Sequence, residues 1–169
     1  PVEATRQSTG LDALIDNRIM ATAERDLLNF ILTYGTTKLE FQSDSAFYSG
    51  SDEDALTVFD FIGQALEGDN SQFANSVFRK VYEAYSKDYY EGYSQDEIVK
   101  RLMDGEDRDM AYVAAQLSTD ERYDLSVKNL RQSMMSKGSW LTIYVPKAIL
   151  VYQQSRLEDK ENELKERLG

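Results

Sequence analysis

The sequence predicts an all-α protein, built as a multi-helix bundle followed by a C-terminal helical hairpin or a long protruding helix. Apolar residues recur at intervals of three and four along most of the chain, as they do in helices that bury one face. Segments with the strict alternation of a β-strand are scarce. Residues 147–168 contain neither glycine nor proline, so we expect one long helix at the C-terminus.

The first long helix is expected at residues 22–34, after a largely unstructured linker with a short helical turn in residues 1–18. Thr22 is a suitable N-cap, and Gly35 follows the last turn, where glycine commonly ends a helix. Residues 37–42 alternate apolar and polar side chains, and we interpret them as an extended connector that lies along the helices. The predicted buried stripe of this first helix is Met20, Ala23, Leu27, Ile31 and Tyr34.

Two helices are expected in the middle of the chain, at residues 52–66 and 71–90. Ser51 is the predicted N-cap of the first, with Asp54 at the spacing of a capping box. The second carries a long series of apolar and aromatic residues at helical spacing, which predicts that it is the central helix of the core. The inward residues are expected to be Ala55, Val58, Phe59, Ile62 and Leu66 in the first helix, and Phe73, Val77, Phe78, Val81, Tyr82 and Tyr85 in the second.

Residues 85–93, at the end of that second helix, are rich in tyrosine. Tyrosine offers rigid, amphipathic contact area, so one interpretation is a recognition surface. The interpretation that we favour is that these rings cover the helical core and direct their hydroxyls to water.

Three further helices are expected at residues 95–103, 107–117 and 119–136, the first of them capped by Ser94. Residues 137–139 contain a glycine and are expected to end the helix at residues 119–136. The apolar residues 140–145 fit either a strand or the start of the last helix. The predicted inward residues are Ile98, Leu102 and Met103, then Met110, Val113, Ala114 and Leu117, then Tyr123, Val127, Leu130 and Met134.

This pattern divides the chain into a linker at residues 1–18, a helical bundle at 19–118 and a C-terminal hairpin or long helix at 119–169. Pro146 is expected in the first turn of the last helix, where its missing N–H has no cost. The first half of this helix is apolar, whereas nearly every residue after Arg156 is charged. The apolar side chains among them are Leu157, Leu164 and Leu168. Such a polar helix is not stabilised by a core of its own, so its end is either a solvated extension or a handle for a partner.

The charge of the chain disfavours direct binding to nucleic acid. The formal net charge is −11, and the segment between Lys38 and Arg79 contains eight acidic residues and no Lys or Arg. Ordinary solubility is the simpler explanation, and a basic partner surface is the alternative. The sequence has no apolar run long enough to cross a membrane, and no cysteine. We therefore expect a cytoplasmic protein, and the polar start without Met suggests a segment cut from a longer one.

The sequence contains no pattern of catalytic residues. Histidine and cysteine are absent, which removes most nucleophile and base pairs and all thiolate metal sites. The acidic stretch at residues 104–109 would need Gly in place of Asp109 and Glu in place of Ala115 to be a calcium-binding loop. No particular pair of carboxylates is indicated for a hydrolase. We therefore expect no catalytic, cofactor-binding or metal-binding residue in this chain.

Three segments carry a resemblance to a known family: ERDLLNFILTYG (24–35), FIGQALEGDN leading into FANSVFRKVYEAY (61–85), and LSTDERYDLSVKNL (117–130). Together they resemble the C-terminal domain of bacterial DNA primase of the DnaG type, in particular its Bacteroidetes members, over roughly residues 19–168. The resemblance implies a non-catalytic helical bundle with a helical hairpin that docks on the N-terminal domain of the replicative helicase. The parent protein would be a primase, a DNA-directed RNA polymerase, but the family's zinc site and polymerase domain have no counterpart here.

The expected partner-binding residues are therefore Leu157, Leu164 and Leu168, which would enter a groove on the helicase, with Tyr152 at the base. An alternative is that the three leucines pack against the preceding helix of their own chain. A second function also remains open, namely a generic helical adaptor that forms a homodimer through its last helix, although the leucine spacing is too short to establish heptads. A carboxylate-based enzyme is the third possibility.

Overall fold

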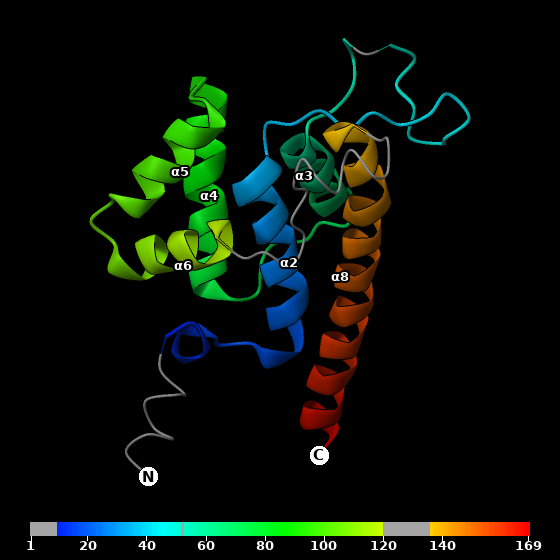
Figure 1. The fold of residues 1–169 in the computed structure, drawn as a ribbon. Helices are drawn as coiled ribbons and strands as arrows, with labels where there is room; N and C mark the ends of the chain where they lie inside the picture. The colour runs from blue at the N-terminus through cyan, green and yellow to red at the C-terminus, as the bar shows by residue number, and fades with distance from the viewer. Residues whose placement is uncertain (1–9, 52, 120–135) are drawn as a thin grey trace.

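The computed structural model of the chain describes residues 10–51, 53–119 and 136–169, and within these ranges the protein is all-α, as predicted (Figure 1). One isolated antiparallel bridge joins Lys38 to Thr57, and the described residues form no sheet. The helix expected at residues 119–136 lies outside the described residues. In chain order the elements are η1 (Asp12–Leu14), α2 (Arg18–Tyr34), α3 (Val58–Gly68), α4 (Ser76–Glu91), α5 (Gln95–Met103), α6 (Arg108–Ser118) and α8 (Lys137–Leu168).

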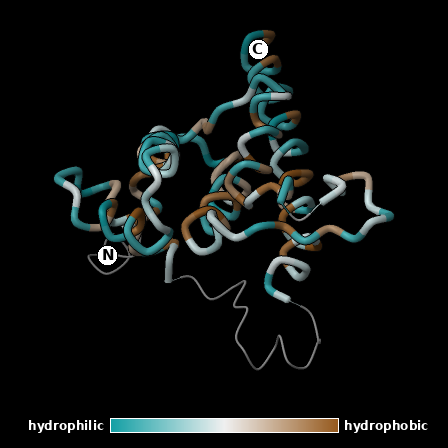
Figure 2. Tube along the Cα trace, turned by 90° about the horizontal axis from the view of Figure 1, so that it is seen from above, coloured by the Kyte–Doolittle hydropathy of each residue, from teal (hydrophilic) through white to brown (hydrophobic). Residues whose placement is uncertain are grey.

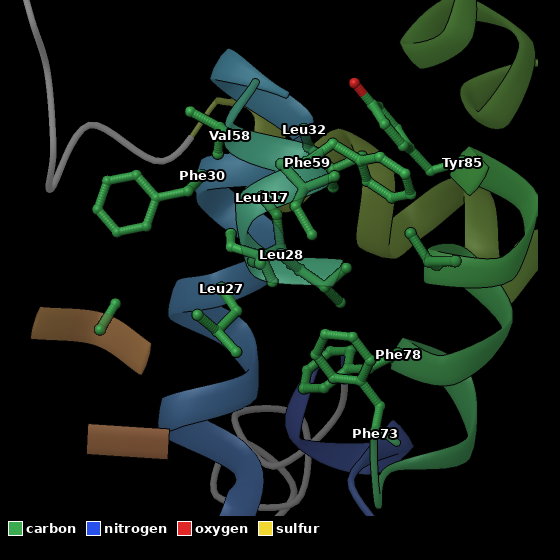
Figure 3. Packing of buried hydrophobic residues seen from close by; sticks show 14 of the residues in the cluster. Leu27, Leu28, Phe30, Leu32, Val58, Phe59, Phe73, Phe78, Tyr85 and Leu117 are labelled. Atoms are coloured by element: carbon green, nitrogen blue, oxygen red, sulfur yellow. The ribbon is translucent and has the colours of Figure 1, made fainter. Parts of the chain in front are cut away.

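Helix α2 is the centre of the core, and the expectation that residues 71–90 hold this place is wrong. α2 contacts α3, α4, α5, α6 and α8. Its buried residues form more than the predicted stripe, because every residue from Leu27 to Leu32 is buried, and their side chains point to several sides of the helix (Figure 3). Over these two turns α2 is therefore surrounded by other parts of the chain.

The start of α2 also differs from the prediction, because the N-cap is Asn17 and Thr22 lies exposed inside the helix. The Asn17 side chain accepts a hydrogen bond from the Met20 N–H at 3.0 Å. Asn75 holds Asn17 in place: its amide oxygen accepts from the Asn17 N–H at 2.8 Å, and its amide nitrogen donates to the Asn17 carbonyl at 3.0 Å. The cap thus depends on a residue far away in the sequence.

The N-cap of α3 is Thr57, so the prediction of Ser51 as this cap is wrong. α3 begins at Val58, where the Thr57 hydroxyl accepts from the Asp60 N–H at 3.1 Å. The connector after α2 pairs with the residues before α3: the Leu39 N–H donates to the Leu56 carbonyl, and the Val58 N–H donates to the Thr37 carbonyl, both at 2.9 Å. These bonds require an extended backbone, so the helix cannot start at residue 52. Ser51 and Asp54 instead close a small turn of their own.

A buried carboxylate from α2 caps helix α4, which starts at Ser76 and not at residue 71. The Asn75 side chain is engaged elsewhere and makes no cap bond. Glu24, which is fully buried, accepts from the N–H groups of Ala74 and Asn75 and from the Asn75 amide at 2.8 Å. Burial raises the pKa of Glu24, and the hydrogen bonds from Ala74 and Asn75 together with nearby Arg79 lower it without cancelling that rise.

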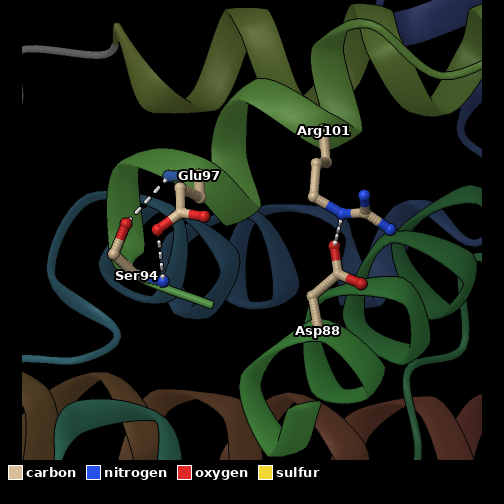
Figure 4. Close-up of polar contacts among 4 residues, drawn as sticks. All are labelled: Asp88, Ser94, Glu97 and Arg101. Carbon is tan, nitrogen blue, oxygen red and sulfur yellow. Dashed lines mark hydrogen bonds and ion pairs between the residues drawn. The ribbon is translucent and has the colours of Figure 1, made fainter. Parts of the chain in front are cut away.

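The expected bounds and cap of α5 are confirmed. Ser94 and Glu97 form a complete capping box, drawn in Figure 4, in which each side chain accepts from the backbone N–H of the other. Figure 4 also shows the Arg101 Nε donating to Asp88 at 2.9 Å, which ties α5 to the end of α4. Met103 is exposed, so its predicted inward position is wrong.

Most of the tyrosines of α4 cover the core, as we favoured, but the expectation that their hydroxyls are directed to water is wrong for Tyr85 and Tyr89. Tyr85 is buried, and its hydroxyl donates to Gln95 at 2.6 Å. The Tyr89 hydroxyl donates to Asp60 at 2.9 Å, which joins α4 to α3. A Cβ at Gly35 would lie 2.0 Å from the Tyr85 hydroxyl oxygen, so glycine is required where α2 ends. Tyr90 alone of this group is largely exposed.

Helix α8 begins at Lys137, so residues 137–139 form its first turn and are not a helix-breaking segment. Residues 140–145 belong to the same helix, which decides between the two predicted alternatives. Pro146 lies well inside α8 and not in its first turn. The chain tolerates it there although Pro146 has no N–H to bond the carbonyl of Thr142. α8 packs along α2 and α3 and shares their hydrophobic core.

We predict that Glu24→Ala lowers the free energy of unfolding by about 2 to 4 kcal/mol, because three donors, of which the two on Asn75 are buried, lose their acceptor. Chemical denaturation of the whole chain measures this change. A loss below about 0.5 kcal/mol, as is usual for surface substitutions, would contradict the capping role.

Glu24→Gln tests the pKa. A carboxyl whose pKa is raised in the folded state stabilises the fold below its unfolded pKa and loses this contribution as pH rises through the folded pKa. The stability of the wild type relative to Glu24→Gln should therefore fall from pH 4.5 upward. A difference that grows with pH in this window would contradict the raised pKa.

Candidate functional site

The sequence of α8 places its first turn tightly against the bundle. The Ser136 hydroxyl caps the helix by accepting from the Ser139 N–H at 3.1 Å. A Cβ at Gly138 would lie 2.5 Å from the Lys38 carbonyl oxygen, so only glycine permits this approach. The Gly138 carbonyl accepts from the Glu40 N–H at 3.3 Å. The N-terminal end of α8 is thus anchored on the connector between α2 and α3.

One face of α8 belongs to the core. Tyr152 is only 1% exposed, and its hydroxyl donates to the Gln72 carbonyl at 3.1 Å. Burial raises the pKa of Tyr152 to about 12, so its hydroxyl remains protonated and continues to donate. This inner face consists of Gly138, Leu141, Val145, Ala148, Ile149 and Tyr152.

The opposite face of α8 carries a second apolar stripe, which we call the outer stripe. At 3.6 residues per turn, residues seven apart lie on nearly the same side of a helix, with a drift of about 20° per seven residues. Ile143, Leu150, Leu157 and Leu164 follow this spacing, and Leu168 comes one turn later on the same side. Their exposed fractions are 53% for Ile143, 59% for Leu150, 64% for Leu157, 57% for Leu164 and 89% for Leu168.

The end of α8 extends beyond the rest of the bundle (Figure 1). The last side-chain contacts to the bundle are made by Arg156, which reaches Ser71 and the Asp69 carbonyl, and by Asp159, which accepts from the Asn17 amide at 3.2 Å. Every residue from Lys160 to Gly169 is exposed. These final turns of α8 span about 13 Å at 1.5 Å per residue. In Figure 2 this stretch is mostly hydrophilic, with hydrophobic residues at intervals.

The structure separates the four residues that the sequence predicts as a binding site. Leu157, Leu164 and Leu168 lie together on the outer stripe, and the described part of the chain does not cover them. Tyr152 lies on the inner face, so the expectation that it forms the base of the same surface is wrong. Its aromatic ring is directed into the bundle because the Gln72 carbonyl and the Phe73 ring, at 6.3 Å between centroids, lie on that side.

Sequence reasoning missed Ile143 and Leu150, which extend the stripe toward the start of the helix. The seven-residue interval that joins them to Leu157 and Leu164 was the available signal. It was hidden because both residues lie among the apolar residues of the inner face. The alternation of inner and outer residues becomes visible only when the helix is known to start at Lys137.

The acidic residues outside α8 form no metal centre in the part of the chain that the structure describes. No three acidic side chains in these ranges converge as metal ligands. Asp107, from the stretch with a superficial likeness to a calcium loop, caps α6 by accepting from the N–H groups of Asp109 and Met110, both at 3.1 Å. None of the described helices has the length and apolar character needed to cross a membrane.

Comparison with known protein families gives a match over most of the chain. The family model described as "Domain of unknown function (DUF8430)" matches residues 12–169, which include every helix of the described structure. No curated protein and no solved structure matches the chain.

The two faces of α8 provide a matched pair of substitutions. We predict that Leu141→Ala on the inner face lowers the free energy of unfolding by about 2 to 5 kcal/mol, because it leaves a cavity in the core. Leu150→Ala, the same change on the outer stripe, should cost less than about 0.5 kcal/mol. Urea denaturation of both variants measures the difference. An equal loss in the two would show that Leu150 is covered within its own chain.

Proposed function

This chain belongs to the DUF8430 family, and from that premise we propose that it is the non-catalytic interaction domain of a DnaG-type bacterial primase. In this role it docks on the N-terminal domain of the replicative helicase and couples primer synthesis to unwinding at the fork. The setting is the bacterial cytoplasm. The domain itself makes no contact with nucleic acid, which its net charge of −11 disfavours.

The observation that carries this proposal is the outer stripe of α8. Five aliphatic side chains lie exposed along one line of a helix whose last turns stand clear of the bundle. Burying a leucine of this kind stabilises a complex by about 1.5 to 3 kcal/mol, so the stripe offers several such contributions to a partner. An amphipathic helix with anchors at regular intervals fits the groove of another protein. Tyr152 contributes indirectly, because it fastens the inner face of α8 to the bundle.

The choice of partner rests on the resemblance to primase. The first segment that carries the resemblance, ERDLLNFILTYG, covers α2 from Glu24 onward and Gly35. The second, residues 61–85, covers the end of α3 and most of α4. Both segments have their roles in the core, so they support the identity of the domain and not the position of its contact surface. The contact surface is assigned from the exposure of the leucines.

The second candidate function is a helical adaptor that self-associates through α8. The interval of seven residues from Ile143 to Leu164 favours it, because a coiled-coil seam repeats at this period. Such a seam needs a second apolar position in each heptad, three or four residues after the first. In α8 the positions three residues later are held by Pro146, Gln153, Lys160 and Arg167, and those four residues later by Lys147, Gln154, Glu161 and Leu168. The seam is therefore only half apolar, which favours insertion into a groove over pairing with an identical helix.

We predict that Leu164→Asp abolishes co-elution of this chain with the N-terminal domain of the replicative helicase from the same genome. The reason is that a carboxylate in an apolar groove is strongly disfavoured. Size-exclusion chromatography of the mixture measures the complex.

Asn162→Asp is the matched control, because it introduces the same charge on the opposite side of the same exposed turns. It should leave co-elution intact. Unimpaired binding by Leu164→Asp removes the outer stripe from the interface. A concentration-dependent dimer of the chain alone in sedimentation, lost in Leu164→Asp, would favour the adaptor.

A further inference from the structure

The loop between α2 and α3 holds a cluster of aromatic rings. This loop lies at the N-terminal end of α8, whereas Leu168 lies at the C-terminal end. This loop stands away from the bundle in Figure 1. Phe41 and Phe47 from the loop and Phe61 from α3 contact one another, with ring centroids 5.3 to 5.5 Å apart in each pair. Aromatic pairs at this separation attract one another, which gives the loop a small core of its own.

Beside these rings the surface forms a recess of about 240 Å³, which we call the aromatic hollow. Phe47, at its rim, is 56% exposed, and its neighbour Tyr48 is also exposed. Pockets for whole small molecules are usually larger, on the order of 300 to 1,000 Å³, so the aromatic hollow has the size for one side chain. Its apolar lining is formed by Leu39, Phe41, Phe47, Tyr48, Ala55, Leu56 and Phe61.

The charged residues that follow Lys38 on this loop are all acidic. Asp44, Glu53 and Asp54 are exposed on the same loop, and no Lys or Arg occurs between Lys38 and Arg79. The nearest cation in the sequence, Lys38, donates to the Glu53 carbonyl at 3.3 Å. Such a surface attracts basic groups and repels phosphates.

We propose that the aromatic hollow docks a peptide segment of a partner protein in which one large apolar side chain is flanked by Lys or Arg. The apolar side chain enters the recess and packs on the rings of Phe41 and Phe47. The flanking cations lie toward Asp44, Glu53 and Asp54, and they also gain from the exposed aromatic faces. Charge complementarity excludes acidic peptides and nucleic acid from the same place.

This surface goes beyond the proposed docking on the helicase, because it uses none of the residues of the outer stripe. The loop touches α8 only near its start, where the Glu40 N–H donates to the Gly138 carbonyl and Ser136 donates to the Glu40 carboxylate. Leu157, Leu164 and Leu168 lie about 30 Å or more along α8 from its first residue, Lys137, at 1.5 Å per residue. A partner held by these three leucines therefore leaves the aromatic hollow accessible, and each surface can be tested without the other.

The test is an NMR titration of the whole ¹⁵N-labelled chain with the pentapeptide KRLRK, blocked at both ends. The expected result is a set of shifts confined to the amides of residues 38–61, with a Kd on the order of 0.1 to 1 mM. The serine analogue KRSRK should bind at least fivefold more weakly, and the acidic analogue EELEE should not bind. No shift with KRLRK up to several times this Kd overturns the proposal, as do shifts centred outside the loop or equal binding of KRSRK.

Two variants locate the interaction. Phe47→Ala removes the ring at the rim, and Asp44→Lys reverses one charge; each should weaken KRLRK binding at least fivefold. Both residues are exposed, so the spectra should retain the dispersion of the folded chain. Tyr90→Ala, which removes an exposed ring from α4, is the control and should bind as the wild type does. Unchanged binding in Phe47→Ala overturns the proposal and leaves the proposed function untouched.

Discussion

Burial of α2 on nearly all its sides is the constraint on which the other helices depend. Because every residue from Leu27 to Leu32 is buried, α3, α4, α5, α6 and α8 must all find a place around one helix. Glu24 adds direction to this packing, since its carboxylate binds the N–H groups at the start of α4. A buried carboxylate without these donors would be costly. The position of α4 along α2 is therefore set by polar contacts, and the apolar core fills the space between them.

The same packing explains why α8 has two apolar faces with different fates. Its inner face completes the core on α2, and Tyr152 and the close approach at Gly138 hold it there. The contacts between α8 and the bundle stop near Asp159, but the helix continues beyond that residue. The outer stripe therefore runs from the anchored part of α8 into its exposed part. A rigid helix that is fixed at one end and apolar along its outer side presents its leucines in a defined order. A rigid helix loses less conformational entropy than an unstructured tail when it enters the groove of a partner, so this arrangement favours binding.

The two proposed surfaces differ in chemistry. The outer stripe is aliphatic, with charges of both signs beside it, whereas the aromatic hollow combines rings with carboxylates. The segment between Lys38 and Arg79 contains no basic residue, which solubility alone would explain. In the structure, part of this segment surrounds an exposed aromatic cluster. If both proposals hold, the domain links two partners through surfaces at different positions along one helix.

The sequence by itself determined the helical class, the bounds of α5, the buried stripe of α2 and the leucines at the end of α8. These features rest on local patterns, namely the spacing of apolar residues and the capping box of Ser94 and Glu97. Only the tertiary structure decided the caps of α2 and α3, the start of α4 and the central place of α2, because Asn75, Glu24 and the pairing beside Lys38 act on residues remote in the chain. It also separated Tyr152 from the leucines and joined Ile143 and Leu150 to them. Periodicity indicates which residues share a side of a helix, but the side that faces the core is set by the neighbouring helices.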